Sequence, residues 1–95
     1  MKRSIWLMGL MLFLMNGWLQ AQTQQDLQEQ FKKAVEIQEK GDNKQAIALY
    51  EIILKEGFAS SELHNNLGLA YIQKNELGEA ILNFERAIRL NPRNT

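Results

Sequence analysis

The stretch Leu67–Pro92, LGLAYIQKNELGEAILNFERAIRLNP, decides how the rest of the chain is interpreted. Its apolar residues recur at spacings of three and four on both sides of Asn75, which predicts two helices joined by a short turn. Small residues at Gly68, Ala80 and Ala87 let two such helices approach to the short end of the usual range of about 8–10 Å. We expect Gly68 to face Ala80 and Ala87 to face a further helix pair, with neighbouring aromatic side chains filling the space beside the contact.

The same pattern occurs once more, earlier in the chain, and a single shift aligns the two copies without a gap. The aligned residues are Ala34 with Gly68, Gly41 with Asn75, Ala46 with Ala80, Tyr50 with Phe84, and Lys55 with Arg89. A fixed period of this size is typical of stacked helix pairs, each of which buries its apolar face against the next. The sequence therefore predicts an all-α fold of two stacked helix-turn-helix pairs, at 27–60 and 61–94.

The ends of the predicted helices carry residues that suit helix ends. Gly41 and Asn75 follow the first and third helices, and both residue types tolerate the left-handed backbone conformation that often ends a helix. Asp42 can cap the second helix, with a Gln three residues later, and Ser60 can cap the third. Pro92 cannot continue the fourth helix, which we expect to end just before it.

The N-terminal segment, 1–21, differs from the rest and has the pattern of a secretory signal peptide. Lys2 and Arg3 precede an apolar run from Ile5 to Leu19, and Ala21 is a small residue at a suitable cleavage point. We expect export, with a periplasmic or membrane-associated location, and cleavage after Ala21 that leaves 22–95 as the mature domain. An uncleaved membrane anchor is the alternative. It is disfavoured because the run is shorter than the ~20 residues of a spanning helix.

The composition argues against several classes of function. Eleven basic and eleven acidic residues balance, and removal of Lys2 and Arg3 with the signal peptide would leave a net charge of −2, so no nucleic-acid partner is expected. The chain has no Cys, which removes disulfides and thiolate metal sites. His64 lies near Ser60 and Ser61 but without a third member of a catalytic triad. We expect a packed His64 and neither catalysis nor a bound metal or cofactor.

Seven residues of the second pair resemble, in order and spacing, the signature of the tetratricopeptide repeat (TPR) family across Ser61–Asn94. They are Leu67, Gly68, Tyr71, Ala80, Phe84, Ala87 and Pro92. His64 stands where that signature has an aromatic residue, often Trp. The first pair, Leu27–Ser60, is a weaker match. It keeps Ala34, Ala46 and Tyr50 but has Lys33, Ile37, Ile53 and Phe58 where Leu, Tyr, Ala and Pro are usual.

The TPR resemblance implies a short right-handed α-solenoid whose inner groove, formed by the first helix of each pair, binds a protein or peptide partner. The candidate partner-binding residues on those helices are Phe31, Val35, Gln38, Asn65, Asn66, Leu69, Ile72 and Gln73. Asn66 matches the Asn with which some TPR proteins clamp a carboxylate, but Phe31 and Val35 replace the Lys and Asn of that clamp. A chaperone-like acidic C-terminus is therefore not the expected ligand. A solvated surface role for Asn65 and Asn66 is the alternative.

The longer stretch Tyr50–Pro92, behind a signal peptide, is similar to the N-terminal part of BatE-type aerotolerance-operon TPR proteins. Those proteins typically show Tyr-Glu-x-Ile-Leu-x-x-Gly ahead of Ser-x-x-Leu-x-x-Asn-Leu-Gly. This chain has YEIILKEG at 50–57 and SSELHNNLG at 60–68. The resemblance implies an exported or membrane-associated partner-binding subunit, and we expect the chain to be a piece of a longer protein.

We therefore expect a non-catalytic adaptor or scaffold that docks a peptide or partner helix against the first-helix face. One alternative is a structural, self-associating repeat segment of a longer BatE-type membrane protein, with no ligand of its own. The last predicted helix pair leaves apolar surface uncovered, through which it can pair with another copy. The other alternative is an accessory part of a membrane-bound enzyme complex.

Overall fold

The computed structural model describes residues 23–94, which are helical and contain no strand. A first helix covers 23–39 of this part, followed by α2 (Asn43–Lys55), α3 (Ser61–Gln73), α4 (Leu77–Leu90) and the 3-10 turn η1 (Pro92–Asn94). None of these helices is long and apolar enough to cross a bilayer. The predicted all-α fold is confirmed, whereas the predicted signal peptide, 1–21, lies outside the described residues.

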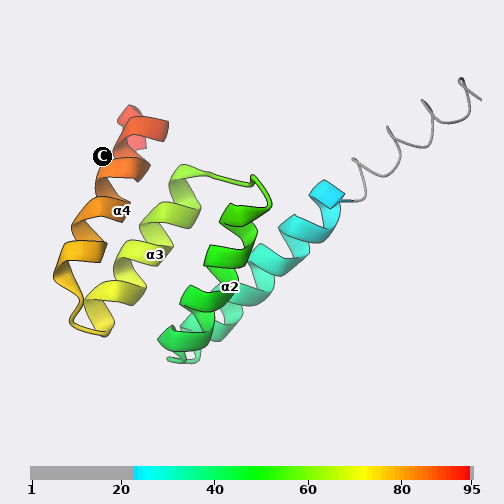
Figure 1. The fold of residues 1–95 in the computed structure, drawn as a ribbon, viewed down its shortest axis with the longest axis horizontal. Coiled ribbons are helices and arrows are strands. Elements are labelled where there is room, and N and C mark those ends of the chain that lie inside the picture. The colour runs from blue at the N-terminus through cyan, green and yellow to red at the C-terminus, as the bar shows by residue number, and fades with distance from the viewer. Residues whose placement is uncertain (1–22, 95) are drawn as a thin grey trace, which may run out of the picture.

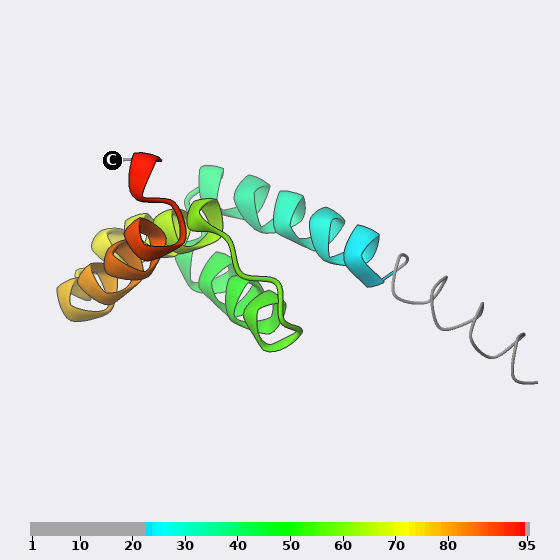
Figure 2. The same ribbon diagram turned by 90° about the horizontal axis from the view of Figure 1, so that it is seen from above.

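The four helices lie side by side in chain order, from the first helix to α4 (Figure 1). Seen from above, the first helix and α3 lie in one layer, and α2 and α4 lie in another (Figure 2). α3 is the central element because it contacts both α2 and α4. This arrangement agrees with two helix pairs stacked on each other.

Three helix ends share one backbone arrangement. Gly41, Gly57 and Asn75 follow their helices with φ of 92°, 92° and 62°, in the left-handed region. The residue after each of them donates its N–H to a carbonyl five residues back, as Glu76 does to Tyr71 at 2.8 Å. This arrangement satisfies carbonyl groups that would otherwise be unpaired at a helix end. The predicted roles of Gly41 and Asn75 are confirmed.

The two predicted N-terminal caps are also confirmed. Asp42 Oδ1 accepts from the Gln45 N–H at 3.1 Å, and Ser60 Oγ accepts from the Leu63 N–H at 3.0 Å. Each bond satisfies a backbone donor that has no partner within its helix. The α4 helix lacks this support, because its cap residue Glu76 makes no side-chain hydrogen bond to the helix.

One apolar core joins the first helix pair to α3. Its buried members are Leu27, Ala34, Ala46, Ile47, Tyr50, Ile53, Leu63, Leu67 and Ala70. The three members from α3, Leu63, Leu67 and Ala70, are fully buried and recur at spacings of four and three, so they line one side of the helix. The side of α3 that faces the first pair is therefore apolar and closely packed.

Gly68 brings α3 close to α4, but its nearest neighbour is Phe84. A Cβ atom at Gly68 would lie 2.6 Å from Phe84 Cε1, which is closer than packed carbon atoms tolerate. The prediction that Gly68 faces Ala80 did not include this ring, whose atoms are the three nearest to such a Cβ. The glycine makes room for an aromatic ring on the other helix, so the ring forms the contact itself and does not merely fill space beside it.

Ala87 is also placed differently from the prediction that it faces a further helix pair. Its side chain is 2% exposed, so the described helices already bury it. The buried residues of α4 are Ala80, Asn83 and Ala87, at spacings of three and four. These residues define the side of α4 that packs inward.

Gly68→Ala should lower the free energy of unfolding by about 1–3 kcal/mol, because the added methyl group overpacks the contact with Phe84. Gly78→Ala is the matched control, because Gly78 lies in α4 and has nothing within 4 Å of an added Cβ. Removing that helical glycine should instead stabilise the protein by about 0.5–1 kcal/mol. Urea unfolding followed by circular dichroism measures both variants, and equal effects would contradict the close contact.

Candidate partner-binding surface

The solvent-facing side of α3 carries two apolar side chains between polar ones. Leu69 and Ile72 are 51% and 42% exposed, Gln73 is exposed, and Asn65 is half-buried. Their spacing places them along one side of the helix, away from the side that packs on the first pair. We call these four residues the α3 surface. It contains half of the eight residues predicted as partner-binding candidates.

Two of the candidates on the first helix are packed at the edge of the core. Phe31 and Val35 are half-buried and lie against the buried cluster. The ring centroid of Phe31 is 5.9 Å from that of Tyr50 and 6.3 Å from that of Phe58, with tilted planes in both pairs. Such tilted pairs are favourable beyond their buried area. Phe31 therefore holds the first pair together and presents only part of its surface to solvent.

Gln38, the third candidate on the first helix, joins the two helix pairs through hydrogen bonds. Its Nε2 donates to the backbone carbonyl of Asn66 at 2.8 Å, and its Oε1 accepts from the Tyr50 hydroxyl at 2.6 Å. Both ends of the amide thus have partners within the fold. Helical spacing correctly predicted that Gln38 lies on the first helix. It could not predict the hydrogen bonds of Gln38 to Asn66 and Tyr50.

Asn66 belongs to the same polar network. Burial raises the pKa of Tyr50 from its ordinary value of 10.0 to about 12, and a hydrogen bond with the Asn66 side chain partly opposes this rise. The negative charges of Glu62 and Glu39 raise the pKa further. Tyr50 is therefore a hydroxyl donor at neutral pH, and the backbone carbonyl of Asn66 accepts from Gln38 between the two helix pairs.

A second hydroxyl ties α3 to α2. Tyr71 donates to Glu51 Oε1 at 3.3 Å. Burial is the main cause that raises the pKa of Tyr71 to about 12, and the negative charge of Glu51 raises it as well. The position of α3 against the first pair is therefore fixed by polar contacts at Gln38 and Tyr71 as well as by the apolar core.

A buried polar pair joins α3 to α4. His64 and Asn83 are 5% and 2% exposed, and His64 Nδ1 lies 3.0 Å from Asn83 Oδ1. Asn83 Nδ2 donates to the Glu79 carbonyl at 2.9 Å, so its oxygen faces the ring and His64 Nδ1–H donates to it. The prediction of a packed His64 is confirmed, but sequence reasoning missed Asn83. The available signal was the repeat register, because Asn83 is the counterpart of Leu49 in the first pair.

Two of the three polar residues considered for catalysis have structural partners, whereas the buried Ser61 Oγ has no hydrogen-bond partner among the described residues. Ser60 Oγ caps α3, and His64 is paired with Asn83. Within residues 23–94, no group of three or more His, Asp or Glu side chains is placed to hold a metal ion. The described residues thus show no assembled metal centre.

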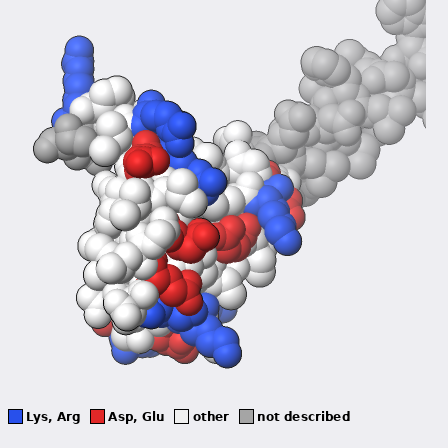
Figure 3. All heavy atoms as spheres, turned by 60° about the vertical axis from the view of Figure 1, so that its left-hand side comes forward, with Lys and Arg blue, Asp and Glu red and all other residues white. Residues whose placement is uncertain are grey.

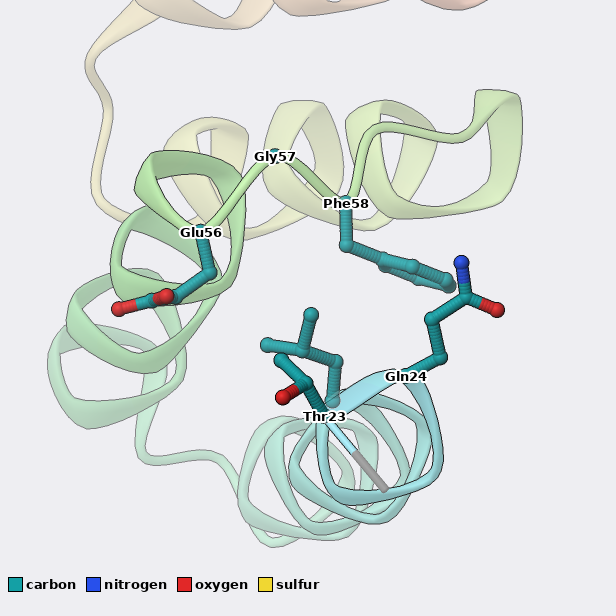
Figure 4. A pocket seen from close by; sticks show the side chains of 6 residues that line it. Thr23, Gln24, Glu56, Gly57 and Phe58 are labelled. Atoms are coloured by element: carbon teal, nitrogen blue, oxygen red, sulfur yellow. The ribbon is translucent and has the colours of Figure 1, made fainter. Parts of the chain in front are cut away.

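A hollow of about 290 Å³ lies where the start of the first helix approaches the turn between α2 and α3. Its lining residues are Thr23, Gln24, Leu27, Glu56, Gly57 and Phe58. In Figure 4 the Glu56 carboxylate points away from Gln24 and Phe58, so the polar groups do not converge on one point. Small-molecule sites usually combine enclosed apolar space with convergent polar groups. The hollow does not have that combination.

Residues 61–94 match the family described as tetratricopeptide repeat. The matched residues span α3, α4 and η1, and they are the ones predicted from the signature. Repeats of this family generally mediate protein–protein interactions and are typically non-catalytic. No curated protein and no solved structure matches the chain significantly. The finer resemblance to BatE-type proteins stays a prediction.

Asn83→Leu should lower the free energy of unfolding by about 1–3 kcal/mol, because it leaves the buried His64 N–H without an acceptor. The double variant His64→Phe/Asn83→Leu should recover most of this loss, since neither polar partner is then left alone. Urea unfolding of the wild type and of the single and double variants measures the coupling between the two positions. Losses that simply add in the double variant would contradict a paired role.

Proposed function

We propose that the chain is a non-catalytic protein-interaction module that docks its partner on the α3 surface. The observation that supports this most is the exposure of Leu69 and Ile72, at 51% and 42%, on a helix whose other sides are packed. The candidates on the first helix are engaged in the core or in hydrogen bonds between the pairs. The docking energy therefore rests mainly on α3.

The chemistry of the α3 surface suits an extended peptide or one face of an amphipathic helix. Leu69 and Ile72 are three residues apart and form one apolar contact area. Asn65 and Gln73 lie on either side, and each amide can both donate to and accept from a peptide backbone. The partner we propose presents apolar side chains to α3 and backbone or polar groups to the two amides.

We further propose that the module works outside the cytoplasm, in an exported or membrane-associated complex that faces the periplasm. The N-terminal segment 1–21, with Lys2 and Arg3 ahead of an apolar run, supports export with cleavage after Ala21. The likeness of 50–92 to BatE-type proteins supports a membrane-associated partner. The proposed location outside the cytoplasm does not depend on which side chains of α3 contact the partner.

Site-specific photo-crosslinking in the source cells tests the α3 surface. A photoreactive amino acid at Leu69 should give one adduct of defined mass, because the partner covers that position. Ile52 on α2 is also 51% exposed and is the matched control, where we expect no such adduct. Ile72→Glu should reduce the adduct from position 69 at least about tenfold, since it places a charge within an apolar contact.

Two outcomes would contradict docking on α3. The first is the same adduct pattern from positions 69 and 52. The second is an adduct from position 69 that survives Ile72→Glu but is lost with Ile52→Glu.

The intact mass of the native protein in fractionated cells tests the cellular setting. We expect a species that begins at Gln22 in the exported fraction, because cleavage after Ala21 removes the signal peptide. A species that keeps Met1 and is recovered from the membrane would establish the uncleaved anchor instead. A species that keeps the N-terminal segment in the cytoplasm would contradict export.

A further inference from the structure

Glu62 extends the α3 surface towards the start of the helix and gives it a negative charge. The exposed residues of α3 are Glu62, Leu69, Ile72 and Gln73. Glu62 lies seven residues, or two turns, before Leu69, so the two side chains lie on the same side of the helix. No other Asp, Glu, Lys or Arg occurs in α3. The surface proposed for docking therefore combines an apolar area with a single negative charge.

A second carboxylate, that of Glu39, belongs to the same contact between the first helix and α3. Gln38 Nε2 donates to the Asn66 carbonyl at 2.8 Å, so the end of the first helix lies beside the middle of α3. Glu39 follows Gln38 directly and is exposed, and Glu62 lies one turn before Asn66. The two carboxylates therefore come from opposite sides of one helix contact.

Both negative charges act on the Tyr50 hydroxyl, which donates to Gln38 at this contact. Burial is the main cause that raises the pKa of Tyr50 to about 12, and the charges of Glu62 and Glu39 raise it further. The effect of a charge on a hydroxyl falls off with distance. The raised pKa thus agrees with the placement of both carboxylates beside the contact.

The two carboxylates have no cation as partner. Neither forms an ion pair within the described part of the chain. Lys40 follows Glu39 directly, and side chains at adjacent positions do not face each other. Lys32 precedes Glu39 by two turns, about 10 Å along the axis, which exceeds the screening length of about 8 Å at physiological ionic strength. On the α4 side, by contrast, Figure 3 shows acidic side chains next to basic ones.

We propose that the partner docked on the α3 surface carries a Lys or Arg side chain beside its apolar residues, and that Glu62 and Glu39 bind this side chain. The proposal rests on the docking of a partner on α3 and adds the charge that the partner carries. A basic side chain meets two carboxylates without a competing cation here, whereas an acidic side chain is repelled. The apolar area supplies packing, and the charges select the partner.

The geometry of α3 fixes where the basic residue lies in the partner. Glu62 is about 10 Å from Leu69 along the helix axis, at a rise of about 1.5 Å per residue. An extended peptide advances about 3.3 Å per residue, so its basic residue should lie about three positions from the residue that packs on Leu69. In a helical partner aligned with α3, the separation should be about seven positions.

Selection of phage-displayed random peptides, about 12 residues long, on the immobilised full chain tests the proposal. The wild type should select peptides that combine an apolar residue with a Lys or Arg at one of these separations. The variant Glu39→Gln/Glu62→Gln should select the apolar residue without the base. Glu29→Gln/Glu36→Gln is the matched control and should select the same peptides as the wild type. It removes the same two charges from exposed positions that, in the repeat register, face away from α3.

Fluorescence anisotropy measures the size of the effect, with one selected peptide and a copy in which Gln replaces the base. Glu62→Gln should raise the dissociation constant of the basic peptide about two- to fivefold, as expected for an exposed ion pair. It should have little effect on the Gln peptide, a difference that a purely structural role of Glu62 would not produce. Glu62 lies in the first turn of α3, where negative charge also stabilises a helix, so circular dichroism checks that the variant is folded.

Two groups of results would overturn the proposal, and they differ in what else they exclude. In the first group, Ile72→Glu abolishes binding of the selected peptides, but these peptides lack a base or are selected equally by Glu39→Gln/Glu62→Gln. That result would exclude a basic partner and leave docking on α3 standing. In the second group, no peptide binds, or Ile72→Glu does not affect the peptides that do. That result would contradict docking on α3 itself, and the basic partner with it.

Discussion

The close approach of α3 and α4 at Gly68 is the constraint on which the rest of the structure depends. With no Cβ at that position, the ring of Phe84 lies directly against the α3 backbone. The helices can then also bury His64 against Asn83 without leaving either polar group unpaired. α3 thus has three sides with different surroundings. Gly68 packs against α4, Leu63 and Leu67 pack in the core of the first pair, and Leu69 faces solvent.

The helix ends and the stacking could be predicted from sequence because each depends on local chemistry or on the period. Gly41 and Asn75 were identified by their tolerance of positive φ, and Asp42 and Ser60 by their capping side chains. The repeat then related the first pair to the second, so the clearer signature at 61–94 supported the weaker one before it. These features follow from residue type and spacing alone.

The side-chain contacts between helices could not be predicted in the same way, since they depend on how far each helix is rotated about its axis. Spacing identified Gly68 as a point of close approach but could not show that the ring of Phe84 is nearest to it. The same limit applies to Gln38, which the helical spacing predicts to lie in the groove but which forms hydrogen bonds within the fold to Asn66 and Tyr50. Asn83 was the exception, because it is polar where its repeat counterpart, Leu49, is apolar. That difference was the one sign in the sequence of a buried polar pair, which Asn83 forms with His64.

The central position of α3 holds the two helix pairs together, and native-state hydrogen exchange resolved by residue tests it directly. Amides of α3, which is packed on both α2 and α4, should exchange at least as slowly as any others in the described chain, through global unfolding. Amides of α3 that exchange faster than those of α2 or α4 would contradict it. In that case the two pairs would open independently, and α3 would be too loosely held to present a defined surface.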